Sequence, residues 1–325
     1  MKAYLGIDVG SVSTNLVLID EQAHIIESYY LRTNGQPIVT LQKGMRKMAA
    51  KLPMKITVNG AGTTGSGRYL AGIITGADII KNEITTHAVA ASSIVPGTKT
   101  VLEIGGQDSK IIILRNGVVS DFAMNTVCAA GTGSFMDQQA SRLNMPIEDF
   151  GPTALKAKTP VRIAGRCAVF AESDMIHKQQ LGYNLPDILA GLCEALVRNY
   201  LNNVGKGKEI LAPAVFQGGV AANVGMKKAF EKALGLEVNI PEHYNVMGAL
   251  GAAILAREET IKTGISNFKG FSVANAKYHA GGFECTGCPN MCEVVEIYES
   301  KKAIARWGDR CGKWSNSIAQ SEKIS

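Results

Sequence analysis

One pattern of predicted elements occurs twice in this chain, and it limits the folds that the sequence can adopt. Apolar periodicity predicts three strands and a helix, with a glycine–serine turn after the first strand, over 3–9, 14–20, 24–33 and 37–51. The same order of strand, glycine turn, two strands and helix begins again near residue 99. A duplication of this size predicts an α/β protein with two similar lobes and a cleft between them.

The remaining segments complete the lobes and add a C-terminal region. A strand is predicted over 55–59, and a glycine loop follows over 60–67. This loop is either a phosphate contact or a flexible connection between strand and helix. Residues 82–87 are interpreted as the solvated start of a helix. Further strands are predicted over 99–104, 109–114, 117–122 and 212–217, and further helices over about 82–93, 131–143, 168–180, 186–202, 223–234 and 247–257. The expected domains are a first lobe over 1–95 with 247–257 packing back, a second lobe over 96–246, a linker over 258–282 and a cysteine module with tail over 283–325.

Composition and charge exclude several function classes. Of the 325 residues, 46% are hydrophobic and 19% are charged, which is typical of a folded globular protein. The formal net charge is only +6, and no dense basic run with interleaved aromatic residues indicates nucleic-acid binding. No apolar run reaches the ~18 residues of a membrane span, and no secretory signal is present. We therefore expect a cytoplasmic protein without nucleic-acid or membrane binding, whose seven cysteines serve metals or redox chemistry.

The first glycine turn follows Asp8 and has the chemistry of a phosphate-binding loop. Glycine lets backbone N–H groups approach phosphate oxygens, and neighbouring hydroxyls add further donors. A carboxylate at the end of a strand can hold hydrated Mg²⁺, which takes only one or two carboxylates. We therefore predict that Asp8 manages Mg²⁺ and that the nucleotide, ATP or ADP, is contacted by Gly10, Ser11, Val12, Ser13 and Thr14.

The second copy repeats this design at Glu103-Ile-Gly-Gly-Gln-Asp108. Gln107 or Asp108 is predicted to orient the attacking water or the metal, as in other phosphoryl-transfer sites. A later strand-to-helix glycine turn leaves room for a flat base or a ribose against the backbone. The predicted nucleotide contacts in this half are Gly105, Gly106, Gly131, Thr132, Gly133, Gln217, Gly218, Gly219, Val220 and Asn223.

Two cysteines stand at the starts of predicted amphipathic helices. Cys128 and Cys167 would each feel the positive end of a helix dipole, which favours the thiolate. Two thiolates are half of the four that a cubane iron–sulfur cluster needs, and a symmetric dimer would supply the other two. The alternative is that either cysteine is a small buried apolar residue. That interpretation suits Cys193, which lies on the apolar face of a predicted helix.

Taken together, these motifs resemble those of the ATP-dependent activators of 2-hydroxyacyl-CoA dehydratases. The wider family includes the ATPase components of benzoyl-CoA reductases and the reductases of double-cubane cluster proteins. The resemblance covers about residues 3–257. It rests on the two glycine turns, on Cys128-Ala-Ala-Gly-Thr-Gly-Ser134, on Cys167-x-Val-Phe-Ala-Glu-Ser173 and on Gly218-Gly-Val-Ala-x-Asn223. Nucleotide motifs alone would also fit hexokinases, actins and chaperones, which lack the cysteine pair.

The resemblance implies an actin/hexokinase-like (ribonuclease H-like) fold and a homodimer. It implies one [4Fe-4S] cluster between the subunits, with Cys128 and Cys167 at the ligand positions. The implied activity is an ATPase that drives one low-potential electron into an iron–sulfur partner enzyme, with ferredoxin or flavodoxin as the electron donor. Which partner enzyme accepts the electron is left open by the sequence.

The C-terminal region carries four further cysteines, Cys285, Cys288, Cys292 and Cys311. The residues between the third and the fourth predict a β-hairpin that returns the last cysteine to the others. Four cysteines that converge in this way predict a metal site, either a structural Cys₄ zinc site or a second [4Fe-4S] cluster. The segment resembles the N-terminal cluster segment of molybdopterin-type oxidoreductases.

Two other functions are compatible with the nucleotide motifs. A sugar or small-carboxylate kinase of the same fold would need a carboxylate as catalytic base on a substrate loop, where the second half of this chain has its cysteine motifs instead. A scaffold or chaperone without redox chemistry would have an ATPase activity that is indifferent to loss of a cluster.

Overall fold

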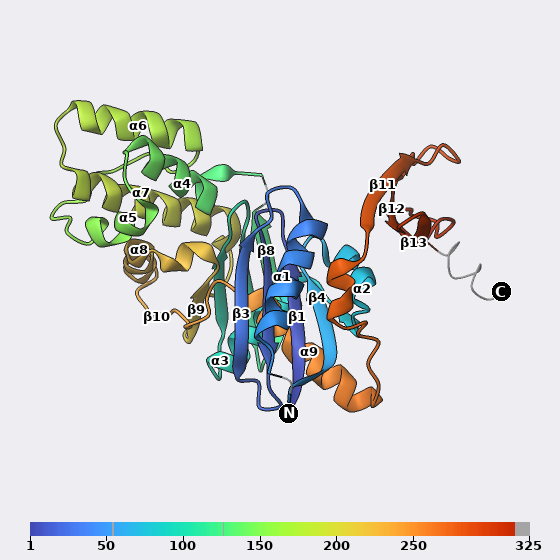
Figure 1. The fold of residues 1–325 in the computed structure, drawn as a ribbon. Helices are drawn as coiled ribbons and strands as arrows, with labels where there is room; N and C mark the ends of the chain where they lie inside the picture. Colours follow the sequence, from blue (N-terminus) through green and yellow to red (C-terminus); the bar gives the residue numbers. More distant parts are fainter. Residues whose placement is uncertain (54, 126, 316–325) are drawn as a thin grey trace. The chain divides into compact units, whose positions relative to one another are not determined.

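The computed structural model describes residues 1–53, 55–125 and 127–315 and divides into two compact units (Figure 1). Unit 1 consists of Met1–Lys81 and Ala252–Ser325, and unit 2 consists of Asn82–Gly251. Each unit contains a five-stranded mixed sheet with helices packed against it. None of the helices in the described ranges is long and apolar enough to cross a membrane.

The sheet of unit 1 has the strand order β3-β2-β1-β4-β5. β1, β2 and β3 form an antiparallel meander, and β4 pairs with β1 and β5 with β4 in parallel. Its strands and helices are β1 (Lys2–Val9), β2 (Ser13–Ile19), β3 (Ile25–Arg32), α1 (Pro37–Lys51), β4 (Thr57–Thr64), α2 (Arg68–Thr75) and β5 (Ile79–Ile80). The interior strands are apolar on both faces, as expected for a sheet that is covered by helices.

The sheet of unit 2 repeats this topology in the order β10-β9-β6-β7-β8. β6, β7 and β8 form the antiparallel meander, and β9 and β10 add parallel strands. The strands are β6 (Thr100–Ile104), β7 (Ser109–Arg115), β8 (Val118–Asn125), β9 (Ala214–Gln217) and β10 (Val238–Asn239). The correspondence of the two sheets confirms the α/β class that the repeated pattern predicted.

Most of the helices belong to unit 2, where α4 to α7 gather into a helical layer (Figure 1). The central helix α7 is capped by the Asn184 side chain, which accepts from the N–H of Asp187, and proline fits its first turn. Its buried face reaches Tyr200, whose ring packs edge-on against Phe230. The helices are α3 (Glu83–Ile94), α4 (Gly133–Arg142), α5 (Ile147–Ala154), α6 (Ala168–Gln180), α7 (Leu185–Tyr200) and α8 (Val224–Leu234).

The predicted glycine loop over 60–67 is mostly strand. Residues 60–64 continue β4, and the turn begins only at Gly65. The reason is a close neighbour in unit 1, because a Cβ at Gly62 would collide with the carbonyl of Ala252. Glycine therefore serves here to admit a neighbouring backbone, which leaves no phosphate loop at these five positions.

The stretch 258–282, which we expected to be a linker, is largely ordered structure attached to unit 1. It holds the end of α9 (Met247–Thr263), a 3-10 turn (Phe271–Asn275) and the start of β11. Gln42 on α1 donates to the carbonyls of Val273 and Ala276, at 3.1 and 2.7 Å. These hydrogen bonds to α1 hold the segment in place, although its sequence lacks the apolar periodicity of a helix or strand. A three-stranded antiparallel sheet follows, formed by β11 (Tyr278–Glu284), β12 (Glu293–Glu299) and β13 (Lys302–Trp307).

Candidate nucleotide-binding turns and cysteine site

The first glycine turn of unit 1 is built from backbone and hydroxyl groups. Gly10 N–H donates to the carbonyl of Ser13 at 2.8 Å, and the Thr33 hydroxyl donates to the carbonyl of Gly10 at 2.9 Å. Asp8 is half-buried, and glycine at position 65 leaves room for its carboxylate. Thr14 departs from our prediction: it is fully buried with its hydroxyl 3.0 Å from that of Thr33, so it supports the turn from behind.

The matching turn of unit 2, residues 105–108, is closed by Gly105 N–H, which donates to the carbonyl of Asp108 at 3.0 Å. Gln107 is exposed and the Asp108 side chain is 32% exposed, so both predicted catalytic side chains are accessible. Gly105 and Gly106 are partly exposed, which suits backbone contacts to phosphate.

A buried lysine stands behind this second turn. Lys110 is 3% exposed, and its ammonium lies 2.9 Å from Asp108, 3.1 Å from Glu103 and 2.9 Å from Glu83. Burial alone would lower the pKa of Lys110, but the three carboxylates raise it well above its usual value, so the ammonium is charged. Lys110 therefore holds the Asp108 carboxylate at the mouth of the turn.

Burial dominates the other ionisable groups of this cluster. It raises the pKa of Glu103 to about 7, against the opposing charge of Lys110. It lowers the pKa of His87 to about 4, and the nearby Lys110 adds to this effect. His87 Nδ1 lies 2.5 Å from the Gln217 amide nitrogen. The helix start at 82–87 is thus not simply solvated as predicted, because it places Glu83 and His87 against the sheet of unit 2.

Gln217 was predicted as a nucleotide contact, but it is fully buried and pairs with His87. The glycine turn that follows it has a more suitable geometry. Gly218 has a φ of +88°, and a Cβ there would collide with the carbonyl of Ile104, whereas Gly219 is exposed with open space above it. Asn223 is buried and caps α8 by accepting from the N–H of Met226 at 3.1 Å. Of the five residues predicted here, only Gly219 is openly accessible, because Val220 is also buried.

The second turn is bonded directly to the segment that follows Cys128. Gly133 N–H donates to the carbonyl of Gly105, and Ser134 N–H to that of Gly106, both at 2.9 Å. The Ser134 hydroxyl also donates to the Gly106 carbonyl, at 2.6 Å. A movement of this turn would therefore be transmitted to the first residues of α4.

Two residues that we predicted as nucleotide contacts in this segment are buried. Thr132 uses its hydroxyl to donate to the carbonyl of Ala129 at 2.7 Å, and a Cβ at Gly131 would lie 2.9 Å from the Asn199 side-chain oxygen. Thr132 is extended, so a 3-10 turn, Ala129–Gly131, follows Cys128 and α4 begins only at Gly133. The helix predicted over about 131–143 therefore forms as α4, but Cys128 precedes a 3-10 turn and does not stand at the start of this helix.

The two cysteine segments lie side by side and share one buried amide. Asn199 on α7 donates to the carbonyl of Gly165 at 2.6 Å, and its nitrogen also lies 3.8 Å from Cys128 Sγ. Cys128 Sγ lies 3.7 Å from the carbonyl of Arg166, and Cys167 directly precedes α6. Both thiols are partly exposed. Three apolar residues close to the cysteines in the sequence are exposed: Val127, Val169 and Phe170, at 95%, 71% and 68%.

Cys193 differs from this pair. It is buried in the core of unit 2, and burial raises the pKa of its thiol to about 12. The interpretation of Cys193 as a core residue is confirmed.

Three of the four C-terminal cysteines, Cys285, Cys288 and Cys292, lie in the connection between β11 and β12. Cys285 and Cys292 are at the two ends of this connection, where Cys285 N–H donates to the carbonyl of Cys292 at 2.8 Å. β13 ends beside the start of β12, because Trp307 pairs with Val295, and Cys311 follows four residues later. Across residues 1–53, 55–125 and 127–315, however, no three His, Cys, Asp or Glu side chains lie where they could together hold a metal ion. The metal module therefore stays a prediction.

Sequence reasoning missed Lys110, Glu83, His87 and Asn199. Lys110 lies two residues after the second glycine turn and directly before the apolar run Ile111–Leu114 of the same strand. A charged residue beside such a run is a sequence signal for a buried, paired charge. Asn199 is a weaker sequence signal, because it is a polar amide near the end of α7, most of whose residues are buried. The pairing of Glu83 with Lys110 depends on tertiary structure alone.

Comparison with known proteins places these features in context. A model of the BadF/BadG/BcrA/BcrD ATPase family matches residues 5–256. The (R)-2-hydroxyglutaryl-CoA dehydratase activating ATPase of Acidaminococcus fermentans is 35% identical over 267 residues, which cover 79% of this chain and 98% of that protein. The 2-hydroxyisocaproyl-CoA dehydratase activator of Clostridioides difficile is 32% identical over 78% of this chain and 95% of its own length. The solved structure of the Clostridium difficile activator of the 2-hydroxyisocaproyl-CoA dehydratase, with bound ADPNP, superimposes with a TM-score of 0.72 at 30% identity, covering 81% of this chain and 97% of that one.

Proposed function

Because this chain belongs to the BadF/BadG/BcrA/BcrD ATPase family, we propose that it is an ATP-dependent activator that passes single low-potential electrons to an iron–sulfur partner enzyme. The partner class is that of the 2-hydroxyacyl-CoA dehydratases, which the related activators are named for. The observation that carries the proposal is the set of hydrogen bonds from Gly133 and Ser134 to the carbonyls of Gly105 and Gly106. They join a phosphate-type turn to a cysteine segment within one unit.

The nucleotide end of this activity uses the two glycine turns. In unit 1, the backbone of residues 10–13 would contact phosphate, and Asp8 would hold hydrated Mg²⁺. In unit 2, Lys110 orients the Asp108 carboxylate from behind, and the exposed Gln107 is free to position the attacking water. Lys110 bonds one oxygen of Asp108, so the accessible remainder of the carboxylate suits a metal-bound water.

The redox end uses Cys128 and Cys167. The residues around them fit an anionic metal cluster, since the Asn199 amide lies near one sulfur and both thiols are partly exposed. A [4Fe-4S] cluster held by these cysteines and the same pair of a second copy would accept and release one electron at a time. The exposed Val127, Val169 and Phe170 supply apolar area for the second copy, so the proposed assembly is a homodimer.

Coupling between the two ends follows from the bonded turn. The Gly105 N–H closes the turn, so the phosphate contact in this turn would be made by the N–H of Gly106. When the γ-phosphate leaves, that N–H would lose its partner, and the first two residues of α4 are hydrogen-bonded to the carbonyls of Gly105 and Gly106. A shift there changes the hydrogen bonding and the exposure at Cys128, which are two of the properties that tune a cluster's potential. In this way ATP hydrolysis would control electron delivery.

The C-terminal cysteines form the last part of the proposal. Cys285, Cys288 and Cys292 lie in the β11–β12 connection, and Cys311 follows β13, whose end pairs with the start of β12. This order along the sheet supports a second metal held by the four cysteines, either zinc or a [4Fe-4S] cluster. The metal could stabilise this end of the module or relay electrons, and the iron and zinc content of the protein distinguishes the two.

The experiment is metal and sulfide analysis of anaerobically purified protein, with EPR spectra after reduction, for the wild type, Cys128→Ala and Cys193→Ala. We expect about four irons and two zincs per dimer if the module holds zinc, and about twelve irons if it holds a cluster. Cys128→Ala should lose the four irons of the bridging cluster while it retains nucleotide binding, and Cys193→Ala, the matched thiol control, should keep them. Full iron content in Cys128→Ala would refute the bridging cluster, and phosphorylation of a sugar pool would favour a kinase.

A further inference from the structure

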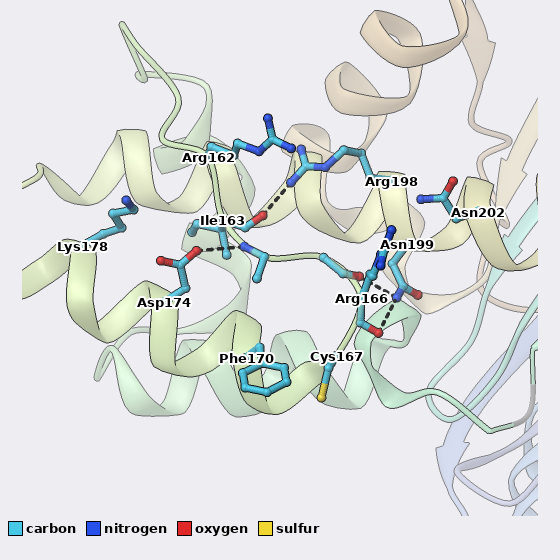
Figure 2. A pocket seen from close by; sticks show the side chains of 12 residues that line it. Arg162, Ile163, Arg166, Cys167, Phe170, Asp174, Lys178, Arg198, Asn199 and Asn202 are labelled. Atoms are coloured by element: carbon cyan, nitrogen blue, oxygen red, sulfur yellow. Dashed lines mark hydrogen bonds between the residues drawn. The ribbon is translucent and has the colours of Figure 1, made fainter.

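A concave, cationic groove with a volume of about 720 Å³ lies along the Cys167 segment (Figure 2). Four cations line it: Arg162 and Arg166 precede α6, Lys178 lies on α6, and Arg198 lies on α7. Cys167 is itself one of the lining residues. The groove is therefore formed by the same loop and helix that present this thiol.

Within the part of the chain that the structure describes, the four positive charges of the groove face a single negative charge, that of Asp174. None of the four cations forms an ion pair there. The one carboxylate that lines the groove, Asp174, accepts from the backbone N–H of Ala164 at 2.9 Å. Arg198 is fixed in place because it donates to the carbonyl of Ile163 at 2.6 Å. Four like charges held together repel one another, and an anionic partner would relieve that repulsion.

The exposed apolar residues adjoin the groove, and one of them, Phe170, lines it together with Cys167. Figure 2 shows the head groups of Arg162, Arg166 and Arg198 on one side of the loop backbone, and the side chains of Cys167 and Phe170 on the other. Apolar surface suits a lasting interface, whereas concentrated charge suits a fast, transient and salt-sensitive encounter. The two sides are therefore suited to different partners.

We propose that this groove docks the small acidic redox protein that reduces the metal centre of Cys128 and Cys167, an inference that rests on the proposed function. One electron leaves the reduced carrier and enters the oxidised cluster, and no bond is formed or broken. A protein is favoured over a small anion because the cations are spread over a loop and two helices, with Lys178 and Arg166 at opposite ends of the view in Figure 2. A single phosphate would engage only one or two of them.

The test compares two double variants with the same change in charge. Arg162→Glu with Lys178→Glu reverses two groove charges, and neither side chain holds the loop by a hydrogen bond in the described structure. Lys43→Glu with Lys262→Glu reverses two exposed cations of unit 1 as the control. The initial rate of cluster reduction is followed by absorbance and EPR, at low and high salt, with one of two reductants: a reduced acidic ferredoxin or reduced methyl viologen, a small molecule.

For the groove variant we expect reduction by ferredoxin at low salt to slow at least ~10-fold and to lose most of its salt dependence. Reduction by methyl viologen should be unchanged, and the control should behave as the wild type does. Equal rates with ferredoxin in both variants would overturn the inference. Normal reduction but slowed delivery to the acceptor enzyme would also overturn it, because the groove would then serve the acceptor. A wild type that methyl viologen cannot reduce would instead refute the proposed function, and this inference with it.

Discussion

The two units carry the same turn in the same place, but they support it with different chemistry. In unit 1, the turn at residues 10–13 is backed by the neutral hydroxyls of Thr14 and Thr33. In unit 2, the turn at residues 105–108 is backed by Lys110 among three carboxylates and is bonded to the cysteine segment. The duplication thus preserves the shape of the turn, while in the described residues the second copy is hydrogen-bonded to the segment that follows Cys128.

The largest difference between the turns should appear when Lys110 is replaced. Lys110→Met leaves Glu103, Glu83 and Asp108 without their shared cation, and removal of one partner from a buried charged cluster costs about 3–5 kcal/mol. We expect the free energy of unfolding in urea to fall by this amount and ATPase activity to be lost. Lys110→Met combined with Glu103→Leu should recover part of the stability. A loss below about 1 kcal/mol would mean that the two turns are supported equally.

The second largest effect is expected when the side-chain amide of Asn199, which contacts both cysteine segments, is removed. Asn199→Leu leaves the carbonyl of Gly165 without its donor, and an unsatisfied buried acceptor costs about 1–3 kcal/mol. Iron content after anaerobic purification should fall, because both cysteine segments lose their common contact. Asn202→Leu, an exposed asparagine on the next turn of the chain, is the matched control. Unchanged iron in Asn199→Leu would separate Asn199 from the metal site.

The buried His87 of unit 2 predicts a pH dependence of stability. Burial lowers the pKa of His87 from 6.5 in the unfolded chain to about 4, so between these values the unfolded state binds the extra proton. His87 therefore costs stability progressively as pH falls from about 6.5 to 4. In His87→Gln, the free energy of unfolding should decline less than in the wild type across this window. Parallel pH profiles would contradict a neutral, buried His87.

The smallest effect is expected for the first turn. Thr14→Val removes one hydroxyl from the Thr14–Thr33 pair without a change in size, and a net hydrogen bond contributes about 1 kcal/mol. Thermal unfolding should report a loss of this order, and affinity for nucleotide should change little because Thr14 is fully buried. A large loss of nucleotide affinity would restore Thr14 as a ligand contact.

The sequence predicted the parts of this fold that depend on local periodicity. The strands beside both turns and the helices after Cys167 and Asn223 were found because apolar spacing and caps are local signals. Contacts between distant segments were not predictable. At Gly62 a glycine is needed because the backbone of α9 passes beside it. Gln217 is buried and lies within hydrogen-bond distance of His87, which is 130 residues away in the chain.

The candidate site divides along the same line. The cysteines and the accessible Asp108, Gln107 and Gly219 could be identified from motifs, because a motif records which residue types are present. Whether a motif residue is accessible depends on tertiary packing, which buried Thr132 and Asn223 and brought Glu83 to Lys110. The supporting residues, Lys110 and Asn199, belong to no motif that we recognised.

The most direct test of the central claim is amide hydrogen exchange in unit 2 with and without a Mg²⁺–nucleotide complex. If the turn at residues 105–108 and the cysteine segment move as one, nucleotide should change the protection of Gly105 and Gly106 together with that of Gly133 and Ser134. In Ser134→Ala, which lacks the 2.6 Å hydroxyl bond to Gly106, the response at α4 should shrink. A nucleotide response confined to residues 105–108, with no change at 133–134, would contradict the account.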